Sequence, residues 1–421
     1  MAGLRFCMLT TFYPPHNFGG DGIGIRRLTE ALVRRGHEVT VVYDADAFAA
    51  LAPGSPPPAA QREGNPRVIG LKSRLGTLSP LLTQQTGHPV VNGGRIRRIL
   101  DEGDFDVTVF NNMSLIGGPA LLSAGRGVTL YEAHEHWLVC PMHVLWRHNR
   151  EPCTGRQCLR CTLSFHRPPQ WWRYTGLLER NLGHVDGFIA KSEFSRRKHA
   201  EFGFTRDMRV IPYFLPDTDP VERTHPDRVE WGRPYFLFVG RLERIKGLDD
   251  VIPAFRQYRD ADLLIAGDGE HAGALKRLAE GASNIHFLGR IEMNRLRALY
   301  RGSLGLIVPS TGYETFGIIL IEAFREGIPV IARRIGPFPE IVETSEAGLL
   351  FDGPSDLLDA MRQLQGDGEL RDRLSRNGRR AYEQHWTEDA VVPQYLRLIR
   401  EIADRKGGQR VREVLNAEGV A

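Results

Sequence analysis

The chain repeats one pattern twice, and this repetition limits the folds that it can adopt. Short apolar segments of strand length alternate with amphipathic segments of helical length, first over residues 4–212 and again over residues 235–385. Strands that alternate with helices favour parallel sheets, and a chain of 421 residues is too long for one ordinary hydrophobic core. We therefore expect an α/β protein with two domains and a ligand-binding cleft between them.

The expected strands are short, apolar and bounded by turn residues. In the first half they are Leu4–Leu9, Val39–Tyr43, Val68–Leu71, Val107–Phe110, Val128–Glu132 and Phe188–Ala190. In the second half they are Tyr235–Val239, Leu263–Ala266, Ile285–Phe287, Gly305–Val308, Pro329–Ile331 and Leu349–Phe351. Helices are expected between them, beginning with Ile23–Arg35. A last long helix is expected at Glu388–Asp404, and we expect the polar tail beyond Lys406 to be disordered.

A charged segment with four prolines, Ile211–Trp231, has no periodicity and marks the linker between the two domains. We expect an N-terminal domain over residues 1–212, with a cysteine-rich loop at residues 140–161. A C-terminal domain is expected over residues 213–385. The last segment, residues 386–421, contains the long helix, which has no strand after it and is expected to cross back onto the first domain.

The segment P-S-T-G-Y-E-T-F-G-I-I-L-I-E-A-F, residues 309–324, is rich in functional groups. Glu314 follows a strand directly and so lies where open α/β sheets bind ligands. Glu322 lies about two turns into the helix that follows, among apolar neighbours, and a buried charge needs a partner. Two carboxylates can hold hydroxyl groups of one ligand. The backbone N–H groups that begin the helix favour an anion; they belong to Phe316, Gly317 and Ile318.

Hydroxyls and phosphate together indicate a sugar nucleotide as the ligand of this segment. The structural alternative is that Glu314 caps the helix and Glu322 lies on its solvated face. We favour function, because strongly apolar flanks are unusual around a carboxylate that has no role.

Two other segments can contribute to binding a diphosphate. Arg241 and Lys246 leave the end of one strand five residues apart, and a guanidinium fork with an ammonium suits phosphate oxygens. Gly19 and Gly20 lie between the first strand and the first helix, where glycine lets an anion approach the helix N-terminus. The spacing differs from that of the dinucleotide fingerprint. The structural alternatives are solvated loop cations and a plain turn.

His134, in Y-E-A-H-E-H-W, follows a strand and can donate to a substrate hydroxyl or transfer a proton. The H-E-H spacing could indicate a metal, but His134 and His136 would need a turn to converge. The acidic pairs Asp44/Asp46 and Asp104/Asp106 have the D-x-D form that some transferases use for a metal, and we interpret them as solvated loop residues.

Four of the five cysteines, Cys140, Cys153, Cys158 and Cys161, fall within 22 residues. In a reducing compartment, clustered thiols indicate zinc ligands, and C-x2-C is a usual half-site. Structural zinc is our first interpretation, free or redox-active thiols the second, and an iron–sulfur cluster the third.

Charge and apolar patterning bear on location. The chain has no run of 18 apolar residues, and its N-terminus indicates a first strand instead of a signal peptide, so we expect a cytoplasmic protein. Up to Pro212 there are 26 Lys and Arg against 18 Asp and Glu. This excess suits an anionic membrane face or a phosphate-bearing acceptor. The pair Trp171-Trp172 can anchor at a membrane interface or pack under the cysteine loop. We infer no nucleic-acid partner.

These motifs together resemble the retaining glycosyltransferases of family 4, which have the GT-B fold. The resemblance rests on the order of P-P-H-N-F-G-G, G-R-L-E-R-I-K-G, A-G-D-G-E, the E-x7-E segment and G-I-P-V-I-A. It implies two Rossmann-like βαβ domains whose parallel sheets face each other across a cleft, the N-terminal domain for the acceptor and the C-terminal domain for a nucleotide-sugar donor. One departure is V-I-P-Y-F, where many members have Asn-Gly after the proline.

The resemblance also implies roles for the residues above. Glu314 would contact the transferred sugar, Glu322 the ribose hydroxyls, and His134 the sugar near its C6 position. The diphosphate would be bound by Arg241, Lys246 and Gly20. Catalysis would retain the anomeric configuration and need no catalytic metal. A cysteine-rich loop after H-x-x-W-L-V-C resembles a feature of one subset of the family.

The sequence therefore predicts a retaining glycosyltransferase of the hexosyltransferase type. It would move a hexose-type sugar from a nucleotide diphosphate sugar to a glycan, lipid-linked or small-molecule acceptor, in cell-envelope polysaccharide or glycoconjugate synthesis. We expect it in the cytoplasm, in peripheral contact with the inner face of an anionic membrane. The alternatives are a nucleotide-sugar epimerase of the same fold and a metal-thiolate binding or redox protein.

Overall fold

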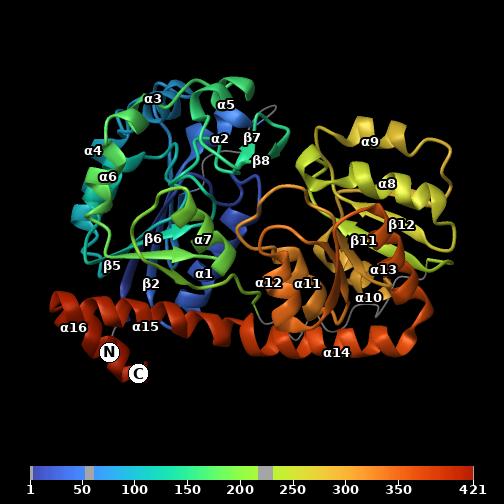
Figure 1. Ribbon diagram of the computed structural model, residues 1–421. Coiled ribbons are helices and arrows are strands. Elements are labelled where there is room, and N and C mark those ends of the chain that lie inside the picture. The colour runs from blue at the N-terminus through green and yellow to red at the C-terminus, as the bar shows by residue number, and fades with distance from the viewer. Residues whose placement is uncertain (1–2, 53–60, 217–230, 421) are drawn as a thin grey trace. The chain divides into compact units, whose positions relative to one another are not determined.

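The computed structural model describes residues 3–52, 61–216 and 231–420 and divides the chain into two compact units, each with its own sheet (Figure 1). Unit 1 consists of Met1–Val144, Gly155–Tyr213 and Glu388–Ala421, and unit 2 of Leu145–Thr154 and Phe214–Thr387. Most of the expected linker, residues 217–230, lies outside the described residues.

Unit 1 is built on an eight-stranded sheet in the order β10-β9-β6-β5-β1-β2-β4-β3. Its strands are β1 Arg5–Thr10, β2 Glu38–Asp44, β3 Gln61–Arg62, β4 Arg67–Leu71, β5 Val107–Phe110, β6 Val128–Ala133, β9 Gly187–Ala190 and β10 Met208–Val210. All neighbouring strands are parallel except β3, which is antiparallel to β4. Almost every residue of β1 is buried, as expected for a central strand that helices cover on both faces.

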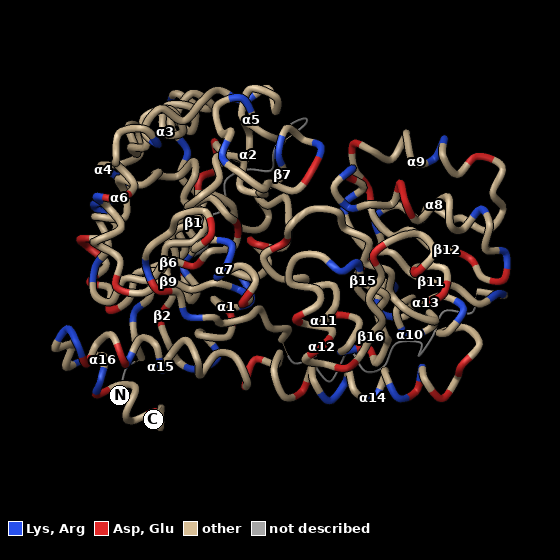
Figure 2. Tube along the Cα trace, in the orientation of Figure 1, with Lys and Arg blue, Asp and Glu red and all other residues tan. Residues whose placement is uncertain are grey.

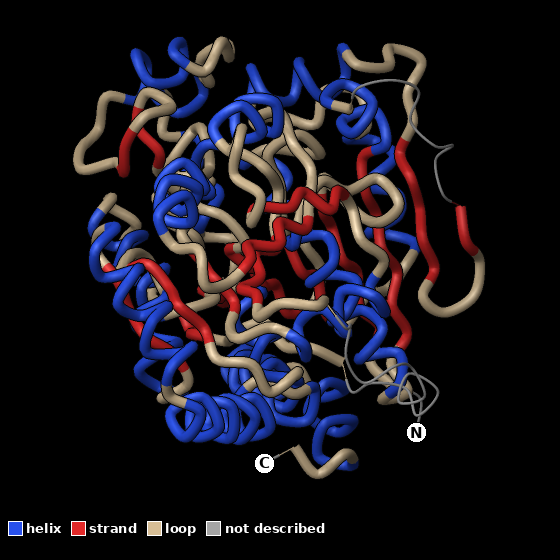
Figure 3. The backbone as a smooth tube through the Cα atoms, turned by 90° about the vertical axis from the view of Figure 1, so that its right-hand side faces the viewer, coloured by secondary structure: helices blue, strands red, loops and turns tan. Residues whose placement is uncertain are grey.

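Figure 3 draws strands in red and helices in blue, and unit 1 has helices between most of its strands and after its last strand. They are α1 Gly20–Arg34, α2 Ala45–Leu51, α3 Leu78–Thr86, α4 Gly93–Glu102, α5 Cys158–Ser164, α6 Leu177–Leu182, α7 Glu193–Glu201, α15 Glu388–Lys406 and α16 Gln409–Ala417, with 3-10 turns η1 Pro119–Ala124 and η2 Trp171–Tyr174. Helix α15 packs against α1 and β6. Arg34 and Arg35 at the end of α1 both pair with the carboxylate of Glu388, the first residue of α15.

Helix α16 overturns the expectation of a disordered tail. It packs on α15, and its buried side chains Val411, Val414 and Leu415 lie three and four residues apart, on one helical face. The prediction was wrong because the polar majority of the tail concealed this narrow apolar stripe.

Unit 2 is built on a six-stranded parallel sheet in the order β13-β12-β11-β14-β15-β16. Its strands are β11 Tyr235–Val239, β12 Asp262–Ala266, β13 Ile285–Gly289, β14 Leu306–Val308, β15 Val330–Arg333 and β16 Gly348–Phe351. Its helices are η4 Arg244–Lys246, α8 Leu248–Gln257, α9 Ala272–Leu278, α10 Met293–Gly302, α11 Ile318–Arg325, α12 Phe338–Ser345, α13 Pro354–Gly366 and α14 Gly368–His385. Unit 2 also contains a hairpin from the cysteine-rich segment, β7 Trp146–Arg147 and β8 Glu151–Pro152.

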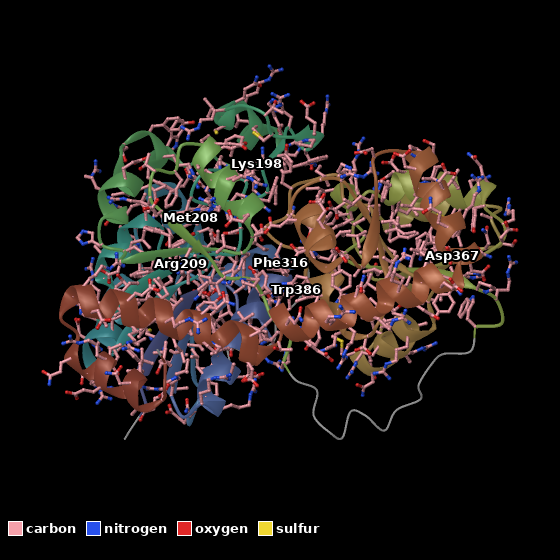
Figure 4. The ribbon with its side chains drawn as sticks, turned by 60° about the horizontal axis from the view of Figure 1, so that its bottom comes forward. Lys198, Met208, Arg209, Phe316, Asp367 and Trp386 are labelled. Atoms are coloured by element: carbon pink, nitrogen blue, oxygen red, sulfur yellow. The ribbon has the colours of Figure 1, made fainter. Side chains whose placement is uncertain are left out.

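Helix α14 shows how local chemistry sets the ends of an element. The Asp367 carboxylate accepts a hydrogen bond from the backbone N–H of Leu370 at 2.9 Å and so caps the helix N-terminus (Figure 4). At the other end, the Trp386 ring stacks on Phe324 of α11 with centroids 5.8 Å apart. Charges of both signs run along α14 (Figure 2).

The prediction of two Rossmann-like domains with parallel sheets is confirmed, and every strand expected from the sequence is present to within two residues. Strands β3, β7, β8 and β10 were not predicted, since two or three residues cannot display a period. Among the described residues, no helix combines the length and apolar character that crossing a bilayer requires.

We predict that Leu415→Asp releases α16 from α15, because the change places a charge where a leucine is fully buried. Hydrogen–deuterium exchange of the α16 amides should become at least about tenfold faster, which corresponds to about 1.4 kcal/mol of local stability. Asn416→Asp, at the neighbouring exposed position, is the control. Unchanged protection in Leu415→Asp would contradict the packing described here.

Candidate functional site

In unit 2, the loops after β11 and β14 bring two of the candidate residues together. The strands are neighbours in a parallel sheet, so both loops leave the sheet at the same edge. Lys246 Nζ donates to Glu314 Oε1 at 2.6 Å, and Ser310 Oγ donates to the same oxygen at 2.9 Å. The Lys246 and Glu314 side chains are 24% and 25% exposed, so the pair is accessible to a ligand while being held by its surroundings.

Gly247 allows these two loops to pack closely. Its φ of +73° lies in the left-handed region, and a Cβ atom there would come within 2.1 Å of the Pro309 carbonyl oxygen. Beside it, the backbone N–H of Thr311 donates to the Ile245 carbonyl at 2.9 Å. The loop backbones therefore support the Lys246–Glu314 pair directly.

Arg241 is not drawn into this pair. Its Nη1 forms an ion pair with Glu243 Oε1 at 2.5 Å, and the side chain is more than half exposed. It lies in the same loop as Lys246, so a ligand at that strand end lies within the range of a long, solvated side chain.

Helix α11 begins one or two residues after the position that the sequence indicated. Phe316 is buried in the loop, Gly317 is the N-cap residue, and Ile318 is the first residue of α11. Glu322 is half-buried on this helix. Burial, together with the nearby Glu322 carboxylate, raises the pKa of the Tyr300 hydroxyl of α10 well above its ordinary value.

In unit 1, α1 begins earlier than expected, so that Gly19 is its N-cap residue and Gly20 its first residue. The first backbone N–H groups of a helix have no partner within the helix. The glycine cluster therefore sits at the helix N-terminus, where an anion is favoured.

His134 is buried, and both of its ring nitrogens have partners. Nδ1 lies 2.5 Å from the Tyr213 hydroxyl, and Nε2 lies 2.9 Å from Asn111 Oδ1. Asn111 Nδ2 donates to the carbonyl oxygens of Leu9 and Val109, which directs its Oδ1 toward the histidine. Because Asn111 Oδ1 can only accept, the hydrogen-bond network places a proton on His134 Nε2.

Tyr213 is the residue at which V-I-P-Y-F departs from the family pattern, and sequence reasoning did not assign it a role. Its ring packs on α1 at Gly24, where a Cβ atom would lie only 2.4 Å from the tyrosine Cε1. The Lys191 ammonium lies over the Tyr213 ring, 4.7 Å from the ring centroid. Tyr213 thus joins the start of α1 to His134.

A buried ion pair lies beside His134 and was also missed. Glu132, at the end of β6, pairs with Lys191, which directly follows β9, and both side chains are almost fully buried. Lys191 Nζ also donates to the Tyr395 hydroxyl of α15 at 2.7 Å, and Glu132 accepts from that hydroxyl. The signal in the sequence is a charge directly at the end of an apolar strand, V-T-L-Y-E and F-I-A-K.

The electrostatics of this pair follow from its burial. Burial alone raises the pKa of Glu132, but the Lys191 ammonium and His134 overcome this effect and hold the pKa well below its usual range. Burial lowers the pKa of Lys191, opposed by Glu132. The lowered pKa keeps the Glu132 carboxylate charged at neutral pH.

The candidate metal ligands do not form a site. Among the described residues, which include all five cysteines, no group of three or more His, Cys, Asp or Glu side chains is placed to hold a metal ion. The zinc interpretation of Cys140, Cys153, Cys158 and Cys161 therefore gains no support, and Cys153 belongs to the hairpin segment of unit 2. His136 does not converge with His134 but stacks on His199, with centroids 5.2 Å apart.

Three acidic residues that were interpreted as solvated are buried instead. Asp44 caps α2 by accepting from the backbone N–H of Ala47 at 3.0 Å, and burial raises its pKa to about 7. Asp46 accepts from the backbone N–H of Ser73 at 2.7 Å, and Asp106 pairs with Arg410. The interpretation was wrong because an aspartate that caps a helix or accepts a hydrogen bond from a neighbouring loop looks the same in the sequence as one in a solvated loop.

The tryptophan pair divides between its two interpretations. Trp172 is buried, with its Nε1 donating to the Gln84 carbonyl at 2.9 Å and the Arg173 guanidinium 4.5 Å from its ring. Trp171 is 58% exposed. Trp172 therefore packs inside unit 1 against α3 and Trp137, and Trp171 faces solvent.

Two protein-family models match the chain, one for each half. The model described as Glycosyltransferase Family 4 matches residues 18–217, and the model described as Glycosyl transferases group 1 matches residues 223–381. Together they span most of the chain.

Curated relatives of the chain agree with the two family models. O-antigen chain mannosyltransferase C of Escherichia coli is 28% identical over 244 residues, which are 55% of this chain and 65% of that protein. The chain spans less than two thirds of the length of the first curated relatives that it matches.

Two solved structures show the fold. Sucrose-phosphate synthase from Thermosynechococcus elongatus superposes with a TM-score of 0.70 at 20% identity, covering 96% of this chain and 100% of that chain. HepE of Anabaena in complex with UDP-glucose superposes with a TM-score of 0.62 at 17% identity, covering 96% and 100%.

We predict that Glu132→Gln lowers the free energy of unfolding of unit 1 by about 3–5 kcal/mol, because it leaves the Lys191 ammonium buried without its counter-charge. Lys191→Met should cost a similar amount, and the double variant should cost less than the sum of the two. Chemical denaturation followed by near-ultraviolet circular dichroism measures all three. Additive losses would show that the two charges do not interact.

Proposed function

The chain belongs to glycosyltransferase family 4, and we propose that it is a retaining enzyme that moves a hexose-type sugar from a nucleotide diphosphate sugar to an acceptor. The proposed acceptor is a glycan, lipid-linked or small-molecule substrate in cell-envelope polysaccharide or glycoconjugate synthesis. The observation that carries the proposal is the Lys246–Glu314 pair at the carboxyl edge of the second sheet, with Glu322 on the helix that follows. The complex of HepE with UDP-glucose supports a donor of this class.

Lys246 is proposed to bind the diphosphate. An ammonium group has three donors, and Glu314 takes one, so two can reach phosphate oxygens. Negative charge builds up on the diphosphate as the glycosidic bond breaks, and a cation already fixed in place stabilises it without reorganisation. Arg241 adds a guanidinium fork from the same loop and can exchange Glu243 for a phosphate.

The carboxylates are proposed to bind hydroxyl groups of the donor. Both hydrogen bonds to Glu314 fall on Oε1, so Oε2 can accept from the transferred sugar. Glu322 is assigned to the ribose hydroxyls. The phosphate is assigned to the backbone N–H groups at the start of α11, which belong to Phe316, Gly317 and Ile318.

In unit 1, the N-terminus of α1 at Gly19 and Gly20 is assigned to the diphosphate as well, and His134 to a hydroxyl near C6 of the sugar. The geometry adds a condition. His134 can serve a substrate only by exchanging the Tyr213 hydroxyl or the Asn111 oxygen for a substrate hydroxyl. An exchange of the Tyr213 hydroxyl would couple binding of the sugar to movement of Tyr213.

Peripheral contact with an anionic membrane, at its cytoplasmic face, is part of the proposal. The positive balance of the first half and the exposed Trp171 support it.

We predict that Lys246→Ala lowers the rate of sugar transfer by about 10²–10³-fold, the loss typical of one removed transition-state donor. The melting temperature should change little, because an ion pair that is partly open to solvent contributes little stability. Lys276→Ala, an exposed lysine of α9 in the same unit, is the control. Transfer is measured with and without acceptor, since an epimerase of this fold would consume donor alone. A wild-type rate in Lys246→Ala would remove this residue from the mechanism.

We predict that one nucleotide diphosphate sugar raises the melting temperature selectively. The panel contains sugars linked to UDP, GDP, ADP and dTDP, and CMP sugars serve as the monophosphate comparison. Binding to the folded state alone stabilises it by mass action. Glu322→Ala should lose this shift, whereas Glu369→Ala, at the exposed start of α14, should keep it. A full shift in Glu322→Ala would disprove its assignment to the donor.

A further inference from the structure

Unit 1 contains a cavity of about 670 Å³ that the donor assignments do not use. It lies between the loop after β6, helix α5, the η2 turn and α6, and its size is that of a small-molecule site. Most of its wall is apolar and formed by Leu138, Val139, Pro141, Leu159, Trp172 and Leu178.

The charges on the cavity wall are unbalanced. Three arginines, Arg156, Arg160 and Arg173, line it, against the one carboxylate of Glu179. An apolar cavity with a surplus of guanidinium groups favours an anion that also carries apolar surface.

Arg173 is held in a defined position. Its Nε donates to Gln170 Oε1 at 2.6 Å and its Nη2 to the Trp137 carbonyl at 2.7 Å, while its guanidinium lies against the Trp172 ring. Burial lowers its pKa to about 10, so it remains a cation at neutral pH. A fixed cation at the wall can bind an anionic group with little loss of side-chain entropy.

The cavity is bordered by apolar side chains that face solvent. On α5, Leu159 lines the cavity and is 45% exposed, while on η2 the aromatic residues Trp171 and Tyr174 are largely exposed. The η2 turn packs on α3, whose Leu78 and Leu81 are also exposed. Apolar surface therefore continues from the cavity wall onto the outside of unit 1, as a long chain would need.

We propose that this cavity binds an anionic lipid, with its chain against the apolar wall and its phosphate on the guanidinium groups. The further assignment of this lipid as a lipid-linked acceptor rests on the proposed transferase function. A free sugar nucleotide fits less well, because one carboxylate on the wall cannot hold its many hydroxyl groups. A neutral apolar ligand would leave the excess positive charge of the wall without counter-charge.

Binding is tested by isothermal titration calorimetry of the whole chain with dodecyl phosphate below its critical micelle concentration. Dodecyl phosphate should bind at least about tenfold more tightly than either inorganic phosphate or dodecyl maltoside, about 1.4 kcal/mol in binding free energy. Equal binding of dodecyl phosphate and inorganic phosphate would overturn the chain site. Equal binding of the two dodecyl compounds would overturn the anion site.

Two variants on α5 separate the cavity from the surface around it. Leu159→Glu places a carboxylate in the cavity wall and should weaken dodecyl phosphate binding at least about tenfold. Leu163→Glu makes the same change at a similarly exposed position of α5 that does not line the cavity, and its affinity should stay within about twofold of the parent. An equal loss in both would assign binding to the outer surface. Arg160→Glu, with Arg196→Glu of α7 as control, repeats the comparison for the head group.

The donor thermal-shift measurement on the same variants separates this inference from the proposed function. If Leu159→Glu binds neither dodecyl compound but still shows the thermal shift with the donor, the cavity site is supported and is independent of the donor site. Failure of dodecyl phosphate to bind, with the donor shift intact, would overturn the cavity alone. Binding of dodecyl phosphate without any donor shift would leave the cavity and overturn the transferase assignment.

Discussion

Neighbouring strands of a parallel sheet end at the same edge, and the proposed donor site of this chain depends on that constraint. Lys246 and Glu314 are 68 positions apart in the chain, yet their side chains are 2.6 Å apart because β11 and β14 are adjacent. Glycine at position 247 lets the two loop backbones touch, so the pair rests on main chain and not on long side chains. A binding group that is held in this way loses little entropy when a ligand arrives.

Unit 1 is organised around a charge pair that is costly to bury. The cost of removing Glu132 and Lys191 from water is offset only because they bond each other, the Tyr395 hydroxyl and their surroundings. Tyr395 comes from α15, so the C-terminal helix completes the polar core of a unit that the N-terminal half begins. His134 and Tyr213 lie against the same pair, which connects the proposed sugar contact to the stability of the unit.

The cysteine-rich segment contributes secondary structure and a cavity wall, whereas no metal site is formed by its described residues. Part of it forms the β7–β8 hairpin of unit 2, and part forms α5, which walls the arginine-lined cavity of unit 1. The segment is polar and rich in arginine, yet the exposed apolar side chains of α5 and η2 gather beside that cavity. Its physical character is that of a surface for an amphiphilic partner.

The sequence by itself determined the two-domain α/β class, every longer strand and the placement of Glu314 after a strand, since these depend on local periodicity and on turn residues. It also indicated the glycine cluster at the start of α1. Tertiary structure alone decided which charges meet. Arg241 and Lys246 look equivalent in the sequence, yet Lys246 pairs with Glu314 and Arg241 with Glu243. The partners of His134 and of the Glu132–Lys191 pair come from segments far apart in the chain, and burial and pairing over such distances have no local period to reveal them.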